Sequence, residues 1–243
     1  MQKVEVSIIL PCYNEGPTFE GSVNKIIRTL NRLGESWEII FVEDKSVDKT
    51  RETVEKLVKK YKNTRAIYHL TNQGRGRSVS DGIRAARGKI CGFLDVDLEV
   101  SESYIPLFIE EIKKGSDVII GKRFYEGGLK SFIRFMASKT YALAVKFLLN
   151  MPIEDTEAGY KFFRRSKILP VLKRVHDKHW FWDTEVCVRS YFANLKISQV
   201  PVLFVRRQNK KSTVKIIPDT WAYLIKLIKF RSEIKKLKKI TNV

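Results

Sequence analysis

The sequence predicts an α/β protein built on a mostly parallel sheet with helices on both faces, and three observations support this prediction. Short apolar runs rich in β-branched residues alternate with longer segments whose apolar residues recur at helical spacing. The loops that follow the apolar runs are polar, as expected along one edge of such a sheet. At 243 residues, the chain is long enough for one well-buried core.

The first half of the chain contains the clearest alternation. Strands are expected at residues 4–10, 37–42, 66–70 and 90–94. Helices are expected between them, at residues 19–33, 50–61 and 78–86. Gly34 is suited to end the first helix, because glycine readily takes the left-handed conformation found at helix ends. This order is typical of parallel strands joined by crossover helices.

The second half of the chain is less regular. We expect a helix at residues 103–113, a strand at 117–120, an apolar helix at 182–193 and a strand at 197–205. Pro201 indicates an edge or irregular position for that last strand, because proline has no backbone N–H to donate. Residues 155–165 form a polar and aromatic stretch without an assigned element. We expect one domain over residues 1–215 and a C-terminal helix over residues 216–243.

The strong positive charge is the most unusual feature of the composition. The net charge of +19 indicates an anionic partner: nucleic acid, an acidic membrane surface or a phosphorylated substrate. The three cysteines lie within apolar runs, which indicates buried thiols in a reducing cytoplasm. Met1 leads directly into a strand without a signal peptide, and no uncharged apolar stretch reaches the roughly 18 residues that span a bilayer. We therefore expect a cytoplasmic protein whose membrane contact is peripheral.

Two aspartates and a glutamate follow the strand expected at residues 90–94. Asp95 and Asp97 would point the same way if the strand continued through them, because strand side chains alternate. Two converging carboxylates favour a hard divalent cation, and Glu99 could add a third ligand or hold a bound water. Taken alone, an Asp-x-Asp sequence favours an ordinary turn, because aspartate is common in turns. The neighbouring motifs favour the metal site instead.

Seven motifs occur in the order that one enzyme family shows. They are LPCYNE, VEDKSVDKT, NQGRGRS, LDVDLE, GKR, DTEAGYKFFRR and VPVLFVRRQNKKST. In this order they resemble the family 2 glycosyltransferases, which have the GT-A (Rossmann-like) fold, and most specifically the dolichyl-phosphate mannose synthase branch. The resemblance covers residues 4 to about 215, and the ordered set is much more specific than any single motif.

The resemblance implies a site for the nucleotide of a nucleotide-sugar donor. Its base and ribose would be held by Pro11, Tyr13, Glu15 and Asp44. The chemistry agrees, because carboxylates accept hydrogen bonds from base N–H groups and ribose hydroxyls, and a tyrosine ring can stack on a base.

The resemblance also implies a metal ion and a closing loop at the donor diphosphate. Asp95 and Asp97, with Glu99, would hold Mg²⁺ or Mn²⁺ against the diphosphate, so Asp95 counts among the donor-binding residues. The mannose synthases are expected to have glutamine where Glu99 stands, and the extra carboxylate makes this site more negative. Arg207 and Ser212 match a mobile loop that closes over the diphosphate, although the usual glycine of that loop is missing here.

A second set of residues matches the clamp that holds the acceptor phosphate in the family. Arg123, in the Gly-Lys-Arg motif, belongs to this clamp together with Arg134 and Ser138. A guanidinium group suits bidentate binding of phosphate. For Arg134, a solvated or membrane-facing charge explains the sequence equally well.

Together these features predict a metal-dependent inverting transfer of a hexose from a nucleotide-sugar to dolichyl or polyprenyl phosphate, with mannose from GDP-mannose as the expected sugar. Asp97, Arg123 and Arg207 are the expected catalytic residues, because they would hold the metal, the acceptor phosphate and the leaving diphosphate. A hydroxyl acceptor is the first alternative, since Glu154 and Asp155 could supply a base. A basic nucleic-acid-binding module is the second, but it leaves the acidic residues at the strand ends unexplained.

The C-terminal segment is basic and amphipathic. Residues 206–243 contain 12 Lys or Arg and 2 Asp or Glu, a net charge of +10 (12 − 2). A basic amphipathic helix lies on an anionic bilayer surface, so we expect peripheral binding to the cytoplasmic face of a membrane. A membrane-anchoring protein is a further candidate partner, and nucleic acid is not an expected one. The alternative is that this helix packs on the domain and its lysines are merely solvated.

Overall fold

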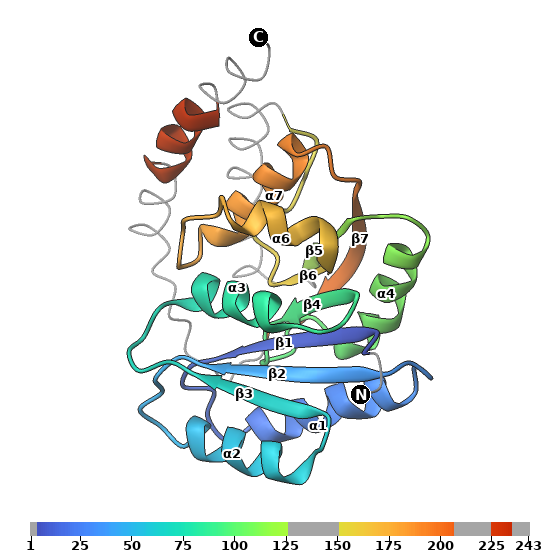
Figure 1. Cartoon of the computed structure of the whole chain (residues 1–243), viewed down its shortest axis with the longest axis vertical. Coiled ribbons are helices and arrows are strands. Elements are labelled where there is room, and N and C mark those ends of the chain that lie inside the picture. The colour runs from blue at the N-terminus through green and yellow to red at the C-terminus, as the bar shows by residue number, and fades with distance from the viewer. Residues whose placement is uncertain (1–3, 126–150, 207–224, 235–243) are drawn as a thin grey trace. The chain divides into compact units, whose positions relative to one another are not determined.

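The computed structural model describes residues 4–125, 151–206 and 225–234 (Figure 1). The chain divides into two compact units, Met1–Glu126 with Asp155–Val205 and Gly127–Glu154 with Arg206–Val243. The first unit contains the sheet, and in the second unit residues 225–234 are helical. This division does not coincide with the expected boundary at residue 215, so the assignment of residues 216–243 to a separate helix stays a prediction.

One mixed sheet forms the centre of the first unit. Its strands, among the described residues, are β1 (Val6–Cys12), β2 (Trp37–Glu43), β3 (Thr64–Tyr68), β4 (Ile90–Leu94), β5 (Val118–Tyr125), β6 (Tyr160–Arg164) and β7 (Ile197–Phe204). They lie in the order β3-β2-β1-β4-β6-β5-β7. The paired strands run parallel except at β6, which is antiparallel to both β4 and β5. The predicted α/β fold with a mostly parallel sheet is therefore confirmed, and Pro201 lies on the edge strand β7 as expected.

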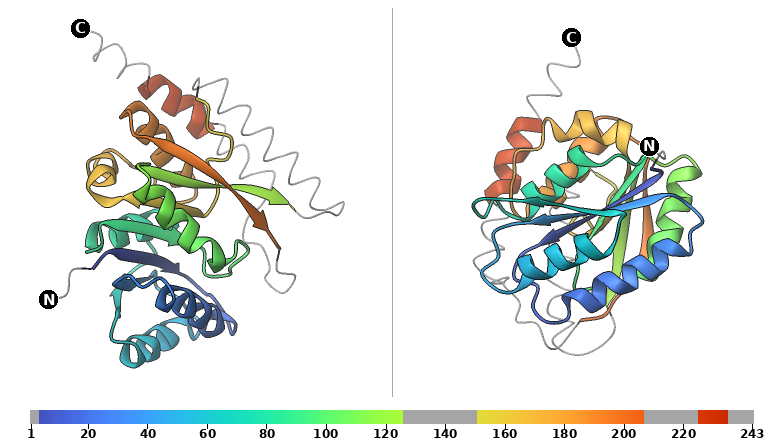
Figure 2. Two further views of the ribbon diagram at one scale, coloured as in Figure 1. Left: turned by 90° about the vertical axis from the view of Figure 1, so that its right-hand side faces the viewer. Right: turned by 60° about the horizontal axis from the view of Figure 1, so that its bottom comes forward.

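Helices cover both faces of this sheet (Figures 1 and 2). They are α1 (Phe19–Asn31), α2 (Thr50–Lys60), α3 (Arg75–Ala85), α4 (Ile105–Lys113), α6 (Arg165–Leu172) and α7 (Trp182–Phe192), with a short 3₁₀ helix at Glu102–Tyr104. Helices α1, α2 and α4 form one group of neighbours, and α3, α6 and α7 form the other. Residues 225–234 belong to the second unit and are described only by themselves.

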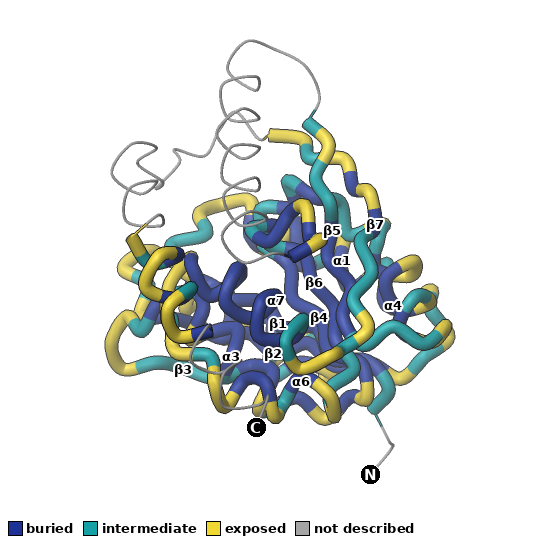
Figure 3. Tube along the Cα trace, turned by 90° about the horizontal axis from the view of Figure 1, so that it is seen from above, coloured by how far each residue is buried: buried dark blue, intermediate teal, exposed yellow. Residues whose placement is uncertain are grey.

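The core explains why the first strands are continuously apolar. Every residue of β1 and β2 is buried, as Figure 3 shows for the centre of the unit. Ile8 packs in the cluster that includes residues of α1, whereas Ile9 lies against Gly82 of α3. A strand buried on both faces needs apolar side chains at successive positions, which is why the alternation of a half-exposed strand is absent.

The cysteines lie in this core. Cys12, Cys91 and Cys187 are all free and buried, so the prediction of buried thiols is confirmed. Burial raises the pKa of both Cys91 and Cys187 to about 12, because a thiolate is poorly solvated there. These two groups are therefore thiols at neutral pH.

The sequence misjudged two boundaries and missed two elements that matter for the site. Helix α3 begins at Arg75 instead of residue 78, and β5 continues to Tyr125 instead of ending at residue 120. Strand β6 and helix α6 lie where no element was assigned. Strand β6 was missed because it contains Lys161, a charged residue that is fully buried there. A buried charge in a strand depends on a partner from elsewhere in the fold, which local sequence does not reveal.

Candidate active site

Four loops meet at one edge of the sheet. Strands β2, β1 and β4 are neighbours and end at Glu43, Cys12 and Leu94. Strand β6 runs the other way and pairs Tyr160 with Leu94, so the residues that precede β6 reach the same edge. The polar residues after β1, β2 and β4 are therefore brought together with residues 155–159, as expected for the crevice of an α/β sheet.

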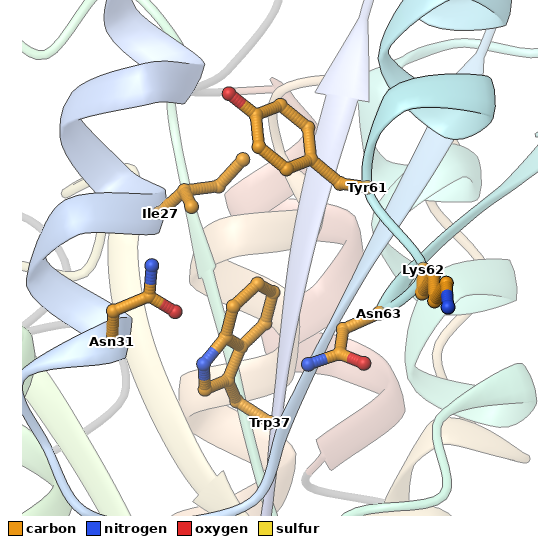
Figure 4. A pocket seen from close by; sticks show the side chains of 6 residues that line it. All are labelled: Ile27, Asn31, Trp37, Tyr61, Lys62 and Asn63. Atoms are coloured by element: carbon orange, nitrogen blue, oxygen red, sulfur yellow. The ribbon is translucent and has the colours of Figure 1, made fainter.

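A pocket of about 190 Å³ lies elsewhere, between α1 and the starts of β2 and β3 (Figure 4). It is lined by Ile27, Asn31, Trp37, Tyr61, Lys62 and Asn63. Trp37 begins β2 and Asn63 directly precedes β3, so this pocket is at the opposite edge of the sheet from the acidic loops. We place the candidate active site at the acidic edge.

A turn, and not a continued strand, brings Asp95 and Asp97 together. Strand β4 ends at Leu94, and the Leu98 N–H donates to the Asp95 carbonyl at 3.2 Å. The alternation argument was therefore wrong, although the two carboxylates do interact. Surrounding protein atoms exclude water from the Asp95 carboxylate and thereby raise its pKa. The charges of Asp97 and Asp183 raise it further, while the charge of Arg75 lowers it. Asp95 nevertheless keeps 39% of its side chain exposed.

The expected role of Glu99 as a third metal ligand stays a prediction. Within residues 4–125, 151–206 and 225–234, no three His, Cys, Asp or Glu side chains are grouped so that they could hold a metal ion. The Glu99 N–H instead donates to Asp97 Oδ1 at 3.3 Å, which is an ordinary aspartate turn. The turn and the pairing of two carboxylates thus coexist in this loop.

Arg75 lies directly beside Asp95 and was not among the predicted site residues. Its Nη2 is 2.7 Å from Asp95 Oδ1, and its Nη1 donates to Asp183 Oδ2 at 2.6 Å. The guanidinium also lies 5.3 Å from the ring centre of Phe93 and 5.1 Å from that of Trp180. Arg75 is the first residue of α3, and the preceding Gly74 has a φ of +92°, which favours glycine.

Gly159 allows the start of β6 to approach these groups. The Asp95 N–H donates to the Gly159 carbonyl at 3.1 Å. A Cβ atom at residue 159 would lie 1.8 Å from Asp95 Oδ2 and 2.7 Å from Arg75 Nη2, which no side chain can do. Glycine is required here for space, because this backbone contacts Asp95 directly.

Asp44 is a buried anchor for the loop before α3. Its carboxylate accepts from the N–H groups of Gln73 at 2.7 Å and Gly74 at 2.8 Å, and from His69 Nδ1 at 2.7 Å. Only 3% of its side chain is exposed. The structure thus gives Asp44 partners within the protein, and its expected contact with the base and ribose stays a prediction.

The loop after β1 contains Tyr13 and Glu15, and hydrogen bonds connect it to the segment that follows β2. The N–H of Asn14 donates to Ser46 Oγ at 3.1 Å, and the N–H of Glu15 donates to Thr50 Oγ1 at 2.8 Å. Tyr13 is 45% exposed, so its ring is accessible to a ligand. Pro11 lies buried inside β1, which continues past the expected end at residue 10.

Arg123 is held by a carboxylate of its own protein. Its Nε and Nη2 donate to the two oxygens of Asp155 at 2.8 and 2.9 Å. Burial of Asp155 opposes its ionisation, but the charge and hydrogen bonds of Arg123 lower its pKa below the usual value. Glu157 lies 3.9 Å from the same guanidinium, but its pKa is raised to about 7. Burial is the main cause. The charges of Asp155 and Asp183 also raise this pKa, while the charge of Arg123 lowers it.

Four of the predicted site residues lie outside the described part of the chain. They are Arg134 and Ser138 of the expected acceptor clamp and Arg207 and Ser212 of the expected closing loop. Their expected roles stay predictions.

The site also contains residues that the sequence did not single out. They are His69, Arg75, Glu157, Lys161 and Asp183. Glycines on both sides of Arg75 were a usable signal, because they indicate a close approach of the backbone to other groups. No local signal marks Lys161 or Asp183, since a lysine in an aromatic stretch and an aspartate at a helix start are both ordinary.

The order of the strands and the acidic loops at their ends agree with the predicted GT-A fold. The chain belongs to glycosyl transferase family 2, whose pattern it matches over residues 7–170, which is more than half of its length. The predicted family is thereby confirmed, and with it the prediction of a glycosyltransferase.

Three relatives are about 30% identical to this chain over the aligned residues. It is 30% identical over 204 residues to the glycosyltransferase AglD of Haloferax volcanii, a match that covers 82% of this chain and 33% of that protein. It is 29% identical over 248 residues to a dolichol-phosphate mannosyltransferase of Pyrococcus furiosus, covering 99% and 68%. It is 28% identical over 223 residues to a dolichyl-phosphate beta-glucosyltransferase of Saccharomyces cerevisiae, covering 83% and 67%. The chain thus spans a third of AglD and about two thirds of the other two relatives.

Solved structures confirm the fold. Glucosyl-3-phosphoglycerate synthase of Mycobacterium tuberculosis, in complex with phosphoglyceric acid, matches with a TM-score of 0.69 at 18% identity, covering 93% of this chain and 80% of that one. A second structure of that synthase, with Mn²⁺, uridine diphosphate and phosphoglyceric acid, matches with a TM-score of 0.68 at 16% identity, covering 93% and 76%. At this identity the likeness concerns the fold alone.

Proposed function

We propose that this chain transfers a hexose, with inversion, from a nucleotide-sugar to the phosphate of dolichol or a related polyprenol. The observation that carries this proposal is that two carboxylates near the site, Asp155 and Asp183, are paired with basic side chains and are therefore poorly suited to act as a general base. Arg123 holds Asp155 through two hydrogen bonds, and Arg75 and Lys161 hold Asp183. A phosphate acceptor is already anionic and needs positioning more than a base.

Relatives named for transfer to dolichyl phosphate support this acceptor, but they differ in the sugar. One is named as a mannosyltransferase and others as beta-glucosyltransferases, at 26–29% identity. We propose mannose from GDP-mannose on the basis of the motif order described above. Glucose is the alternative sugar, and the donor panel described below distinguishes it from mannose.

The acidic edge fits a divalent cation. Asp95 and Asp97 interact as two neighbouring carboxylates after β4, and paired carboxylate oxygens are ligands that hard divalent cations prefer. We propose that these two residues hold Mg²⁺ or Mn²⁺, with Glu99 near them. When bound, such a cation would supply positive charge to the leaving diphosphate. Structures of the mycobacterial synthase that contain Mn²⁺ or Mg²⁺ with uridine diphosphate are consistent with this choice of metal.

The protein's own residues would position the two substrates. Tyr13 is exposed beside the acidic edge and would stack on the base, while Glu15 would accept hydrogen bonds from the nucleotide. Asp44 would act through the loop before α3, because its oxygens are occupied by Gln73 and Gly74.

Residues outside the described ranges would complete the site. We propose that Arg207 and Ser212 close over the diphosphate, and that Arg134 and Ser138 hold the acceptor phosphate. Arg123 would join this clamp through the part of its guanidinium that Asp155 does not occupy, because Nη1 makes neither of the two bonds to that carboxylate.

One observation favours a hydroxyl acceptor instead. Glu157 has a pKa raised to about 7, which is the range suited to a general base at neutral pH. Its side chain is 30% exposed, so an acceptor hydroxyl could reach it. Asp155, which the sequence offered for this role, is less suitable, because its pKa is lowered.

A panel of donors and acceptors tests the proposal. GDP-mannose, GDP-glucose, UDP-glucose and UDP-N-acetylglucosamine would each be incubated with Mn²⁺ and either a polyprenyl phosphate or the corresponding polyprenol. We expect product only with the phosphate, and with GDP-mannose as the preferred donor. Transfer to the polyprenol that is abolished in Glu157→Gln would contradict the phosphate acceptor and favour the hydroxyl acceptor.

Membrane association is the remaining part of the proposal. No helix within the described ranges is long and apolar enough to cross a bilayer. In the second unit, Ile225 and Ile228 are about half exposed, and Lys226 and Lys229 lie beside them in the sequence. We propose that this segment binds an anionic membrane surface on the cytoplasmic face, where the lipid acceptor is found, with or without an anchoring protein.

A further inference from the structure

A buried row of alternating charges ends at the carboxylate of Asp95. Lys161 Nζ donates to Asp183 Oδ1 at 2.5 Å, and Arg75 Nη1 donates to Asp183 Oδ2 at 2.6 Å. Arg75 Nε and Nη2 then lie 2.8 and 2.7 Å from Asp95 Oδ1. The row joins four elements or loops that are far apart in the sequence: β6, α7, the start of α3 and the end of β4.

Burial fixes this row in place. The side chain of Lys161 is fully buried, that of Asp183 is 3% exposed, and that of Arg75 is 12% exposed. These charges cannot exchange their protein partners for water, and removing one partner leaves the next buried charge unpaired. The rings of Phe93 and Trp180 lie close to the guanidinium and restrict it further.

We propose that Arg75 competes with the divalent cation for Asp95, so that the site takes the metal only together with the diphosphate of the donor. This inference rests on the metal site proposed at Asp95 and Asp97. Arg75 holds Asp95, and among the described residues no three Asp, Glu, His or Cys side chains are grouped as metal ligands. We expect oxygens of the diphosphate, together with water, to supply the remaining ligands, and the negative charge of the diphosphate would attract the guanidinium released from Asp95.

The same geometry gives Asp183 and Lys161 a positioning role. Asp183 holds the second arm of the guanidinium and thereby aims Arg75 at Asp95. Lys161 balances the charge of Asp183, so Asp183 does not need a metal or a substrate for neutralisation. Neither residue contacts Asp95 directly in the interactions described above.

The test is the binding of Mn²⁺ to the full-length protein, followed by the electron paramagnetic resonance signal of free Mn²⁺. Arg75→Met removes the competitor, and we expect it to bind Mn²⁺ alone about tenfold or more tightly than the wild-type protein. Arg77→Met is the matched control, because Arg77 is on the same helix and pairs only with Asp81 in the described contacts. We expect this control to bind Mn²⁺ like the wild type. Adding GDP or UDP should strengthen Mn²⁺ binding greatly in the wild type and much less in Arg75→Met.

Two outcomes would overturn the proposal. One is an Arg75→Met protein that is folded by its thermal unfolding curve but binds Mn²⁺ no more tightly than Arg77→Met. The second outcome applies if Arg75→Met does not fold. Arg75→Gln then replaces it, because its neutral amide can still donate hydrogen bonds to a carboxylate, and a wild-type affinity for Mn²⁺ would again contradict competition.

The experiment also separates this inference from the proposed function. A wild-type protein that binds Mn²⁺ with GDP or UDP, combined with an unchanged Arg75→Met, would remove the competition and leave the metal site standing. Asp95→Asn serves as the variant without the proposed metal site. If the wild-type protein binds Mn²⁺ no better than Asp95→Asn under any of these conditions, the metal site is overturned as well. Neither result involves the lipid acceptor.

Discussion

At the scale of single residues, the acidic side chains of this edge differ mainly in their partners. Asp155 is paired with an arginine and has a lowered pKa, whereas Glu157, two residues later, has a raised pKa. Asp44 supports a loop, while Asp95 and Asp97 form a close pair at the end of β4. Residue type alone would treat these five carboxylates as equivalent, and their partners separate structural from chemical roles.

Asp97→Asn should abolish sugar transfer and leave the fold intact. The substitution removes one of the two charges that we assign to the metal, so we expect kcat to fall by at least about a hundredfold. Glu110→Gln, which removes a negative charge from the exposed surface of α4, should leave kcat unchanged. Turnover and thermal unfolding of both variants provide the measurement. Near-normal turnover of Asp97→Asn with excess Mn²⁺ would contradict the metal assignment, and a lowered melting temperature would favour a purely structural turn.

Glu157 should make stability depend on pH in a defined direction. Its pKa is about 7 in the folded protein, above the ordinary value of 4.5. The folded state therefore holds a proton that the unfolded state releases, so this contribution is fully present below pH 4.5 and is lost as the pH rises through 7. From pH 4.5 to 8, the wild type should lose about 1–3 kcal/mol of unfolding free energy relative to Glu157→Gln. Urea unfolding of both proteins over this range measures it, and parallel curves would show that Glu157 has an ordinary pKa.

At the scale of elements, the site depends on β6 running against its neighbours. An antiparallel strand places its first residue, and not its last, at the edge where β4 ends. Gly159 then contacts Asp95 by a backbone hydrogen bond, and Lys161 is buried two residues later. The reversed strand thus brings both a close backbone approach and a buried charge to the acidic edge.

Gly159→Ala should therefore destabilise the protein, in contrast to a glycine with open space around it. The added methyl group would lie 1.8 Å from Asp95 Oδ2, and relieving such overpacking costs about 1–3 kcal/mol. At Gly21 in α1, a Cβ would have no atom within 4 Å, so Gly21→Ala should be neutral or gain about 0.5–1 kcal/mol from helix propensity. Chemical denaturation compares the two variants. Equal stabilities would show that β6 can shift away from Asp95 at little cost.

At the scale of the whole molecule, positive charge and acidic chemistry are found in different parts of the chain. The net charge is +19, although carboxylates gather at the acidic edge of the sheet. A net charge of +10 belongs to residues 206–243 alone. This separation fits an enzyme that binds a cation at one place and an anionic surface at another.

Charge reversal in the second unit should weaken membrane binding. Lys226→Glu combined with Lys229→Glu should lower the partition of the full-length protein onto anionic vesicles by about tenfold or more, because each basic residue near such a surface contributes about 1 kcal/mol. Lys56→Glu with Lys59→Glu is the matched control, since these lysines are exposed on α2 at the same spacing. Flotation with phosphatidylserine-containing liposomes at low and high salt provides the measurement. Equal losses in the two double variants, or no binding by the wild type at low salt, would contradict a membrane surface in the second unit.

Much of this protein could be predicted from the sequence alone. The periodicity of apolar residues predicts the strands and helices of the first half to within about three residues, and the ordered motifs predict the family that the comparisons confirm. These features are local, because burial on one face or both leaves a repeating pattern in the chain itself. The pairing of Asp95 with Asp97 was also predicted, although the reason was a turn and not a strand.

Only the tertiary structure decided which charges neutralise one another. Lys161, Asp183, Arg75 and Asp95 are separated by up to 108 positions along the chain, yet they form one continuous row. A buried ion pair leaves no periodic signal, since each partner needs just one other residue, which can come from any element that packs nearby. For the same reason the sequence could not show that β6 is a strand, that Arg123 is held by Asp155, or that Arg75 already occupies the carboxylate that a metal ion would need.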